Sequence, residues 1–225
     1  TSARVPVLGG GGFVAMMTLA PGVGTVKGDL LASWGGGTVV PVVPMPGGYG
    51  VRIPFVKNTT ETDTGVDLPE GMIVSDVIVQ VTKEVANATI DVGLLFAEDT
   101  NGGDADGFLD AESCAATGFV KHKTVDASAA NNTLGAYLVE SDIKSNDTTA
   151  LFASVPGVHV VNGGQVSVSY TTSNSANLAG NIYVVCAAPG FQIVGRAEET
   201  LAPVTATVDE DTVFVSQDVM ARVYI

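Results

Sequence analysis

The chain has 225 residues and a formal net charge of −14, from ten Lys and Arg against 24 Asp and Glu. So acidic a composition argues against direct binding of nucleic acid, which needs basic footprints on the protein surface. No segment has the run of about 18 apolar residues that a transmembrane helix needs. The two cysteines are too few for a disulfide framework. The first residues, TSARVPVL, lack the apolar core of a signal peptide, which favours synthesis in the cytosol.

Residues 1–50 combine very little charge with glycine runs and prolines. Ordering glycine is entropically costly and proline removes a backbone donor, so this composition disfavours regular structure. Apolar side chains are nevertheless too frequent for a solvated linker. We therefore expect an extended arm that contacts other chains more than its own body. Its candidate partner-binding residues are Phe13, Met16, Trp34 and Met45. For Trp34, packing on the chain's own body is the alternative.

Residues 51–195 show the alternation of apolar and polar residues that is typical of half-buried strands. It is clear in SDVIVQVT (75–82), in TIDVGLLF (89–96) and in GQVSVSYTT (164–172). Glycine-containing turn signals separate these segments, for example at 69–71, 101–103 and 162–164. Strands at this spacing without crossover helices predict an all-β fold, with an antiparallel β-sandwich or jelly-roll-like body over 51–195.

Residues 196–225 begin with a polar, proline-containing link and end in an alternating segment that predicts a C-terminal β-hairpin extension. This hairpin either forms an edge of the body or adds a strand to a neighbouring copy. Residues 1–57 carry a formal charge of +3 and the rest of the chain −17. Like-charged bodies repel unless apolar contacts oppose the repulsion. We therefore expect a homo-oligomer held by its apolar ends.

The acidic segment around 98–110 contains D-x-D-G-x-x-D, with Asp104, Asp106 and Asp110 as carboxylates. Closely spaced carboxylates with a glycine between them can fold around a hard cation such as Ca²⁺. The segment departs from an EF-hand, because Gly102 takes the first ligand position and Ser113 the last, and its flanks are strand-like. The two interpretations are a Ca²⁺ site and a solvated acidic turn.

Catalytic signatures are missing from the sequence. The two histidines, His122 and His159, offer no zinc ligand set without paired cysteines. Nothing like G-x-S-x-G supports a catalytic triad. We therefore expect a protein that is not an enzyme, with no catalytic residues and no required cofactor.

Residues 66–113, with LPEG (68–71), IDVGLL (90–95) and GGDADGFLD (102–110), resemble a pattern found in structural proteins of tailed bacteriophages. The resemblance implies a capsid decoration, or cement, protein on the outer surface of the phage head. It also implies a homotrimer whose extended arms bind the major capsid protein and neighbouring copies. A tail or head–tail component remains an alternative. A carbohydrate- or receptor-binding β-sandwich module is another, and it would need exposed aromatic side chains at its ligand face.

Overall fold

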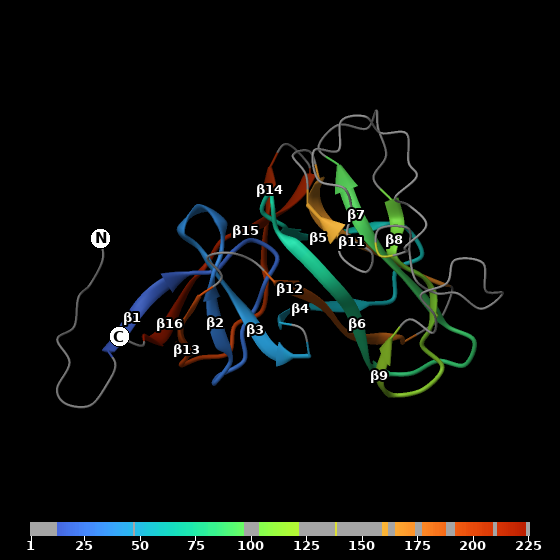
Figure 1. The fold of residues 1–225 in the computed structure, drawn as a ribbon, viewed down its shortest axis with the longest axis horizontal. Helices are drawn as coiled ribbons and strands as arrows, with labels where there is room; N and C mark the ends of the chain where they lie inside the picture. Colours follow the sequence, from blue (N-terminus) through green and yellow to red (C-terminus); the bar gives the residue numbers. More distant parts are fainter. Residues whose placement is uncertain are drawn as a thin grey trace. The chain divides into compact units, whose positions relative to one another are not determined.

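The structure, a computed structural model, describes residues 13–46, 48–96, 104–121, 138, 159–161, 165–173, 177–187, 192–208 and 211–223. Within these ranges the regular structure is β-strand, apart from one short 3₁₀ turn, η1 (Gly35–Gly37). The predicted all-β fold is confirmed (Figure 1). The described residues contain no helix that could cross a membrane.

The chain divides into two units. Unit 1 contains residues 1–44 together with residues 189–225, and unit 2 contains residues 45–188. The first unit is therefore built from both ends of the chain, and the second is inserted between them.

The described part of unit 2 contains nine strands in two antiparallel sheets. They are β4 (Gly48–Val56), β5 (Thr62–Asp67), β6 (Ile73–Lys83), β7 (Thr89–Phe96), β8 (Asp104–Ser113), β9 (Gly118–Lys121), β10 (His159–Val160), β11 (Gln165–Thr172) and β12 (Ala179–Ala187). One sheet has the order β4-β12-β6-β9, with the short β10 also paired to β6, and the other has the order β5-β11-β7-β8.

The pairing of these strands defines a jelly roll. β4 pairs with β12, β5 with β11, β6 with β9 and β7 with β8, all antiparallel. The four pairs nest inside one another like a single long hairpin, and successive pairs alternate between the two sheets. That wrapped hairpin is the double Greek key of a jelly roll. The predicted sandwich body is therefore a jelly roll, with bounds that differ from the predicted ones.

Alternation along the strands explains the core of unit 2. Val77, Val79 and Val81 of β6 are buried, as the period-two pattern predicts. On β11 the polar residues Ser167 and Ser169 are buried as well, although the same pattern predicts them exposed. Their hydroxyls donate to the carboxylates of Asp67 (2.7 Å) and Glu61 (2.8 Å), which satisfies the buried polar groups.

Unit 1 contains strands from the two ends of the chain. They are β1 (Phe13–Thr18), β2 (Leu30–Ser33), β3 (Val39–Met45, whose last residue belongs to unit 2), β13 (Ile193–Ala197), β14 (Val204–Val208), β15 (Asp211–Val215) and β16 (Asp218–Val223). The order β1-β16-β13-β2-β3 places N-terminal and C-terminal strands side by side (Figure 1). β14 and β15 form a separate two-stranded ribbon.

This arrangement differs from the predicted division into an arm (1–50), a body (51–195) and a tail (196–225). Leu31 and Val40, from the expected arm, are fully buried within the chain, as is Val219 from the expected tail. Both ends of the chain carry apolar side chains, and the strands of one end pair with those of the other, so that these side chains are buried. Within the predicted hairpin extension, β14 pairs with β15, whereas β16 pairs with both β1 and β13.

Candidate functional site

An exposed apolar patch lies on the ladder of β1 and β16 in unit 1. Met16 and Met220 lie directly opposite each other in the antiparallel register, and their side chains are 50% and 45% exposed. Val14 is exposed next to them on β1. We call Val14, Met16 and Met220 the edge patch. The neighbouring Val219 and Ala221 point to the other face and are fully buried, so one face of this ladder forms the core and the other forms the patch.

The edge patch borders a strand edge with which no other described strand pairs. Among the described strands, β1 pairs with β16 alone and is the last strand of its sheet. The amide of Leu19 donates to the carbonyl of Gln217 (2.7 Å) just beyond the ladder. Because hydrogen-bonded pairs alternate in antiparallel sheets, the backbone groups of Val14 and Met16 point away from β16. The residues that expose apolar side chains therefore also present backbone donors and acceptors at the edge.

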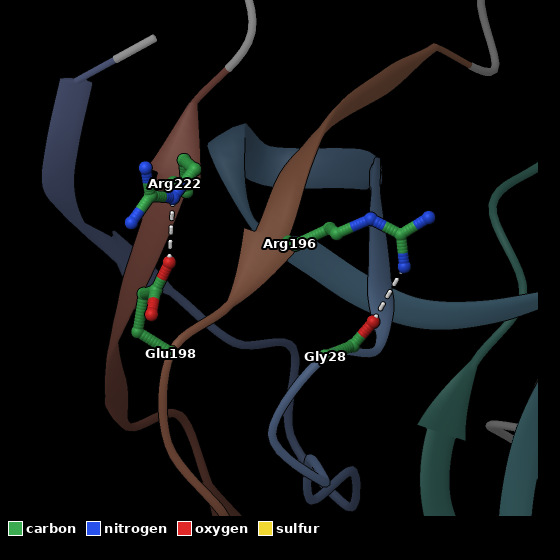
Figure 2. Close-up of polar contacts among 4 residues, drawn as sticks. All are labelled: Gly28, Arg196, Glu198 and Arg222. Atoms are coloured by element: carbon green, nitrogen blue, oxygen red, sulfur yellow. Dashed lines mark hydrogen bonds and ion pairs between the residues drawn. The ribbon is translucent and has the colours of Figure 1, made fainter.

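Charged side chains around the patch are held in contacts with their own unit (Figure 2). Arg222 donates through Nε to Glu198 Oε1 at 2.9 Å, and Arg196 donates through Nη1 to the carbonyl of Gly28 at 2.7 Å. The hydrogen bond from Arg222 lowers the pKa of Glu198. The carboxylate of Glu199 accepts the backbone amide of Met220 at 2.8 Å. Since exposed ion pairs contribute little stability, these contacts mainly fix the rim around the apolar side chains.

The predicted partner-binding residues lie on different elements of the two units. Met16 lies in the edge patch, and Phe13 begins β1, although its side chain lies outside the described part. Trp34 follows β2, is partly buried, and donates its amide to the carbonyl of Thr38 at 2.8 Å. Met45 belongs to unit 2 and packs against Gly50.

Sequence reasoning missed Val14 and Met220 as members of the patch. For Met220 the signal was the alternation in DVMARV, whose other face, Val219 and Ala221, is the apolar one. A methionine on the polar face of an alternating strand is the feature that could have identified it. Val14 carries no comparable signal, because its segment does not alternate.

The three carboxylates of the predicted Ca²⁺ site lie on β8, with Asp106 and Asp110 exposed and Asp104 partly exposed. Burial raises the pKa of nearby Asp91, and the negative charges of Asp110 and Asp106 raise it further. Within the described ranges, no group of three or more His, Cys, Asp or Glu is placed to hold a metal ion. The first part of the acidic segment, 98–103, lies outside those ranges. The Ca²⁺ site stays a prediction, which the melting temperature with and without a chelator decides.

The two cysteines are buried free thiols of unit 2. Burial raises the pKa of Cys186 to about 12, and burial together with the charge of Glu112 raises that of Cys114 to about 12. Both therefore stay protonated at neutral pH, and the thiolate is the reactive form of cysteine. Cys186 belongs to the buried core of unit 2. His159 lies on β10, and His122 lies outside the described residues.

No protein-family model, curated protein or solved structure matches this chain. Its function is therefore argued from its own residues and geometry.

Proposed function

We propose that this chain is a non-enzymatic structural protein of a virus particle, a decoration protein that binds the outside of a bacteriophage head. The observation that carries the proposal is the edge patch on an open strand edge of unit 1. Apolar side chains and backbone hydrogen-bonding groups at one edge suit the addition of an extended strand from a partner. The partners proposed are the major capsid protein and neighbouring copies in a homotrimer, with the trimer number taken from the resemblance.

The jelly roll and the resemblance of residues 66–113 support the same proposal. Jelly rolls occur in viral capsid proteins and in lectins. Because one fold serves many functions, the jelly roll alone does not choose between them. The resemblance to phage structural proteins favours a role in a virus particle over a lectin.

The distribution of charge supports attachment through unit 1. Unit 1 has four basic and seven acidic residues, whereas unit 2 has six basic and seventeen acidic residues. Close contact with a particle surface or a second copy meets less repulsion at unit 1. In the proposed arrangement unit 1 attaches and the strongly acidic jelly roll faces solvent, where net charge favours solubility.

The test is binding to particles assembled without this protein. We expect the double variant Met16→Asp/Met220→Asp to lose at least tenfold in affinity, which corresponds to about 1.4 kcal/mol. The reason is that burying each Met side chain contributes about 1.5–3 kcal/mol, and a charge at the same position prevents it. Labelling of heads and tails in the same sample distinguishes a head protein from a tail component.

The matched control is Val56→Asp, because Val56 is 63% exposed on β4 of unit 2. It introduces the same charge on an exposed strand residue far from the edge patch in sequence. Equal melting temperatures of the three proteins show that folding is intact. Unchanged occupancy of the double variant, or an equal loss with Val56→Asp, contradicts attachment through the edge patch.

A further inference from the structure

A row of three side chains crosses the outer face of the jelly roll. Asn181 of β12 lies opposite Gln80 of β6, and Gln80 lies opposite Phe119 of β9. The adjacent residues Val79 and Ile182 point to the other face and are fully buried in the core. We call Asn181, Gln80 and Phe119 the platform. Its members come from three strands, so the rigid sheet fixes their spacing, with neighbouring strands about 4.8 Å apart.

Hydrogen bonds orient both amides of the platform. The Oε1 atom of Gln80 accepts from the hydroxyl of Tyr183 (3.0 Å) and from Nδ2 of Asn181 (3.1 Å). Among the described residues, neither Gln80 Nε2 nor Asn181 Oδ1 contacts a further partner. The platform therefore presents an NH₂ donor group and a carbonyl acceptor side by side, and both are held in place before any ligand arrives.

An aromatic ring completes the platform. Phe119 is 63% exposed on β9, and its ring centroid lies 5.9 Å from that of Tyr183, which is itself buried. A single exposed apolar residue is ordinary on a protein surface. Here the ring lies beside Tyr183 on the same face of the sheet and next to oriented amides. The platform therefore combines an apolar surface with a few placed polar groups, as small-ligand sites do.

We infer that the platform binds a neutral pyranose, the terminal sugar ring of a glycan. A pyranose has an apolar face of C–H groups that stacks on an aromatic ring, here Phe119. Its adjacent hydroxyls each donate and accept, which matches the donor of Gln80 and the acceptor of Asn181. Unit 2 carries seventeen acidic against six basic residues, so its field repels acidic sugars and favours neutral ones. This inference does not depend on the attachment proposed for unit 1.

The experiment is saturation-transfer difference NMR on the full chain with the methyl glycosides of glucose, galactose, mannose and N-acetylglucosamine. We expect transfer to the ring C–H protons of at least one glycoside. Phe119→Ala should abolish the transfer, and Phe119→Trp should retain it because a larger ring still stacks. Asn181→Ala keeps the ring and removes the acceptor, and should weaken binding at least fivefold. Val56→Ala, on the same sheet, serves as the matched control and should leave the transfer unchanged.

Two results overturn the inference. One is the absence of transfer from the wild-type protein to all four glycosides. The other is transfer that persists in both Phe119→Ala and Asn181→Ala. If a platform variant instead lowers binding to purified phage particles while no glycoside binds the wild type, the platform is a protein contact and not a sugar site. Far-UV circular dichroism of each variant checks that the sandwich is intact, and Phe119→Trp keeps the test decisive if Phe119→Ala does not fold.

Discussion

Deleting residues 216–225 removes β16, and we predict that unit 1 then unfolds while the jelly roll stays folded. β16 lies between β1 and β13 and pairs with both. Its loss therefore separates β1 from the rest of the sheet and leaves β13 with one partner, β2. The deletion tests whether the two ends of the chain really form one cooperative unit.

The structure gives the size of the effect. Val219 is fully buried, and burying a valine side chain contributes about 1.5–3 kcal/mol. Ala221 adds about 0.8 kcal/mol for its methyl group. The ladders on both sides of β16 supply several hydrogen bonds, each of net value about 0.5–1.5 kcal/mol. Together these losses are as large as the whole free energy of unfolding of a unit of roughly 80 residues, which is about 4–12 kcal/mol. We therefore predict that unit 1 unfolds and is not merely less stable.

Hydrogen exchange measured by mass spectrometry distinguishes the outcomes strand by strand. In the truncated chain we expect β2 and β13 to exchange at the rate of a free peptide, and β6 and β12 to keep their protection. A pair of neighbouring substitutions provides the control. Val219→Ala should speed exchange in unit 1, whereas Met220→Ala, on the exposed face, should not. Retained protection of β2 and β13 after the deletion would refute the interleaved core.

Three further predictions concern unit 2. Gly93→Ala should destabilise it by about 1–3 kcal/mol or more, because an added Cβ meets the backbone of Asp104 and that backbone cannot move aside as a side chain can; an unchanged urea midpoint contradicts this packing. Asp91→Asn should raise the free energy of unfolding at pH 7 and lose that advantage at pH 3. The folded protein raises the pKa of Asp91 above its ordinary value of 3.8, so the charged carboxylate opposes folding at pH 7, whereas the protonated carboxyl at pH 3 does not. An equal effect at both pH values excludes titration as the cause. Cys114 and Cys186 should react with a thiol reagent only when urea unfolds the chain, and rapid labelling of the native protein would show that unit 2 opens locally.

The sequence predicted the sandwich because its signal is local. Within strand β6, outward-facing and buried residues alternate from Asp76 to Thr82, and each half-buried strand carries its own pattern of inward and outward residues. Glycine-containing turns then mark where the strands end. Fold class and much of the core of unit 2 could be read from these features, because neither requires knowing which strand pairs with which.

The interleaving of unit 1 could not be predicted in the same way. β1 pairs with a strand that follows it by about two hundred residues in the chain, and β2 and β3 are short or contain prolines. Apolar content alone showed that the segment needed covering but not that the chain's own C-terminal end covers it. The platform was missed for a related reason. Asn181, Gln80 and Phe119 each look like an unremarkable outward residue, and only strand register brings them into one row.

Because unit 1 is split between residues 1–44 and 189–225, the jelly roll is synthesised completely before unit 1 is. Residues 45–188 emerge before residues 189–225, so the nascent jelly roll has all its strands while unit 1 still lacks β13 and β16. Domains generally fold as they are completed during synthesis. Until β13 and β16 have been synthesised, Leu31 and Val40 are not fully buried. A chain that stops before residue 218 lacks Met220, one of the three side chains of the edge patch, and the strand β16 that holds the other two in place. Prematurely terminated products should therefore compete poorly for the attachment sites that the proposed function requires.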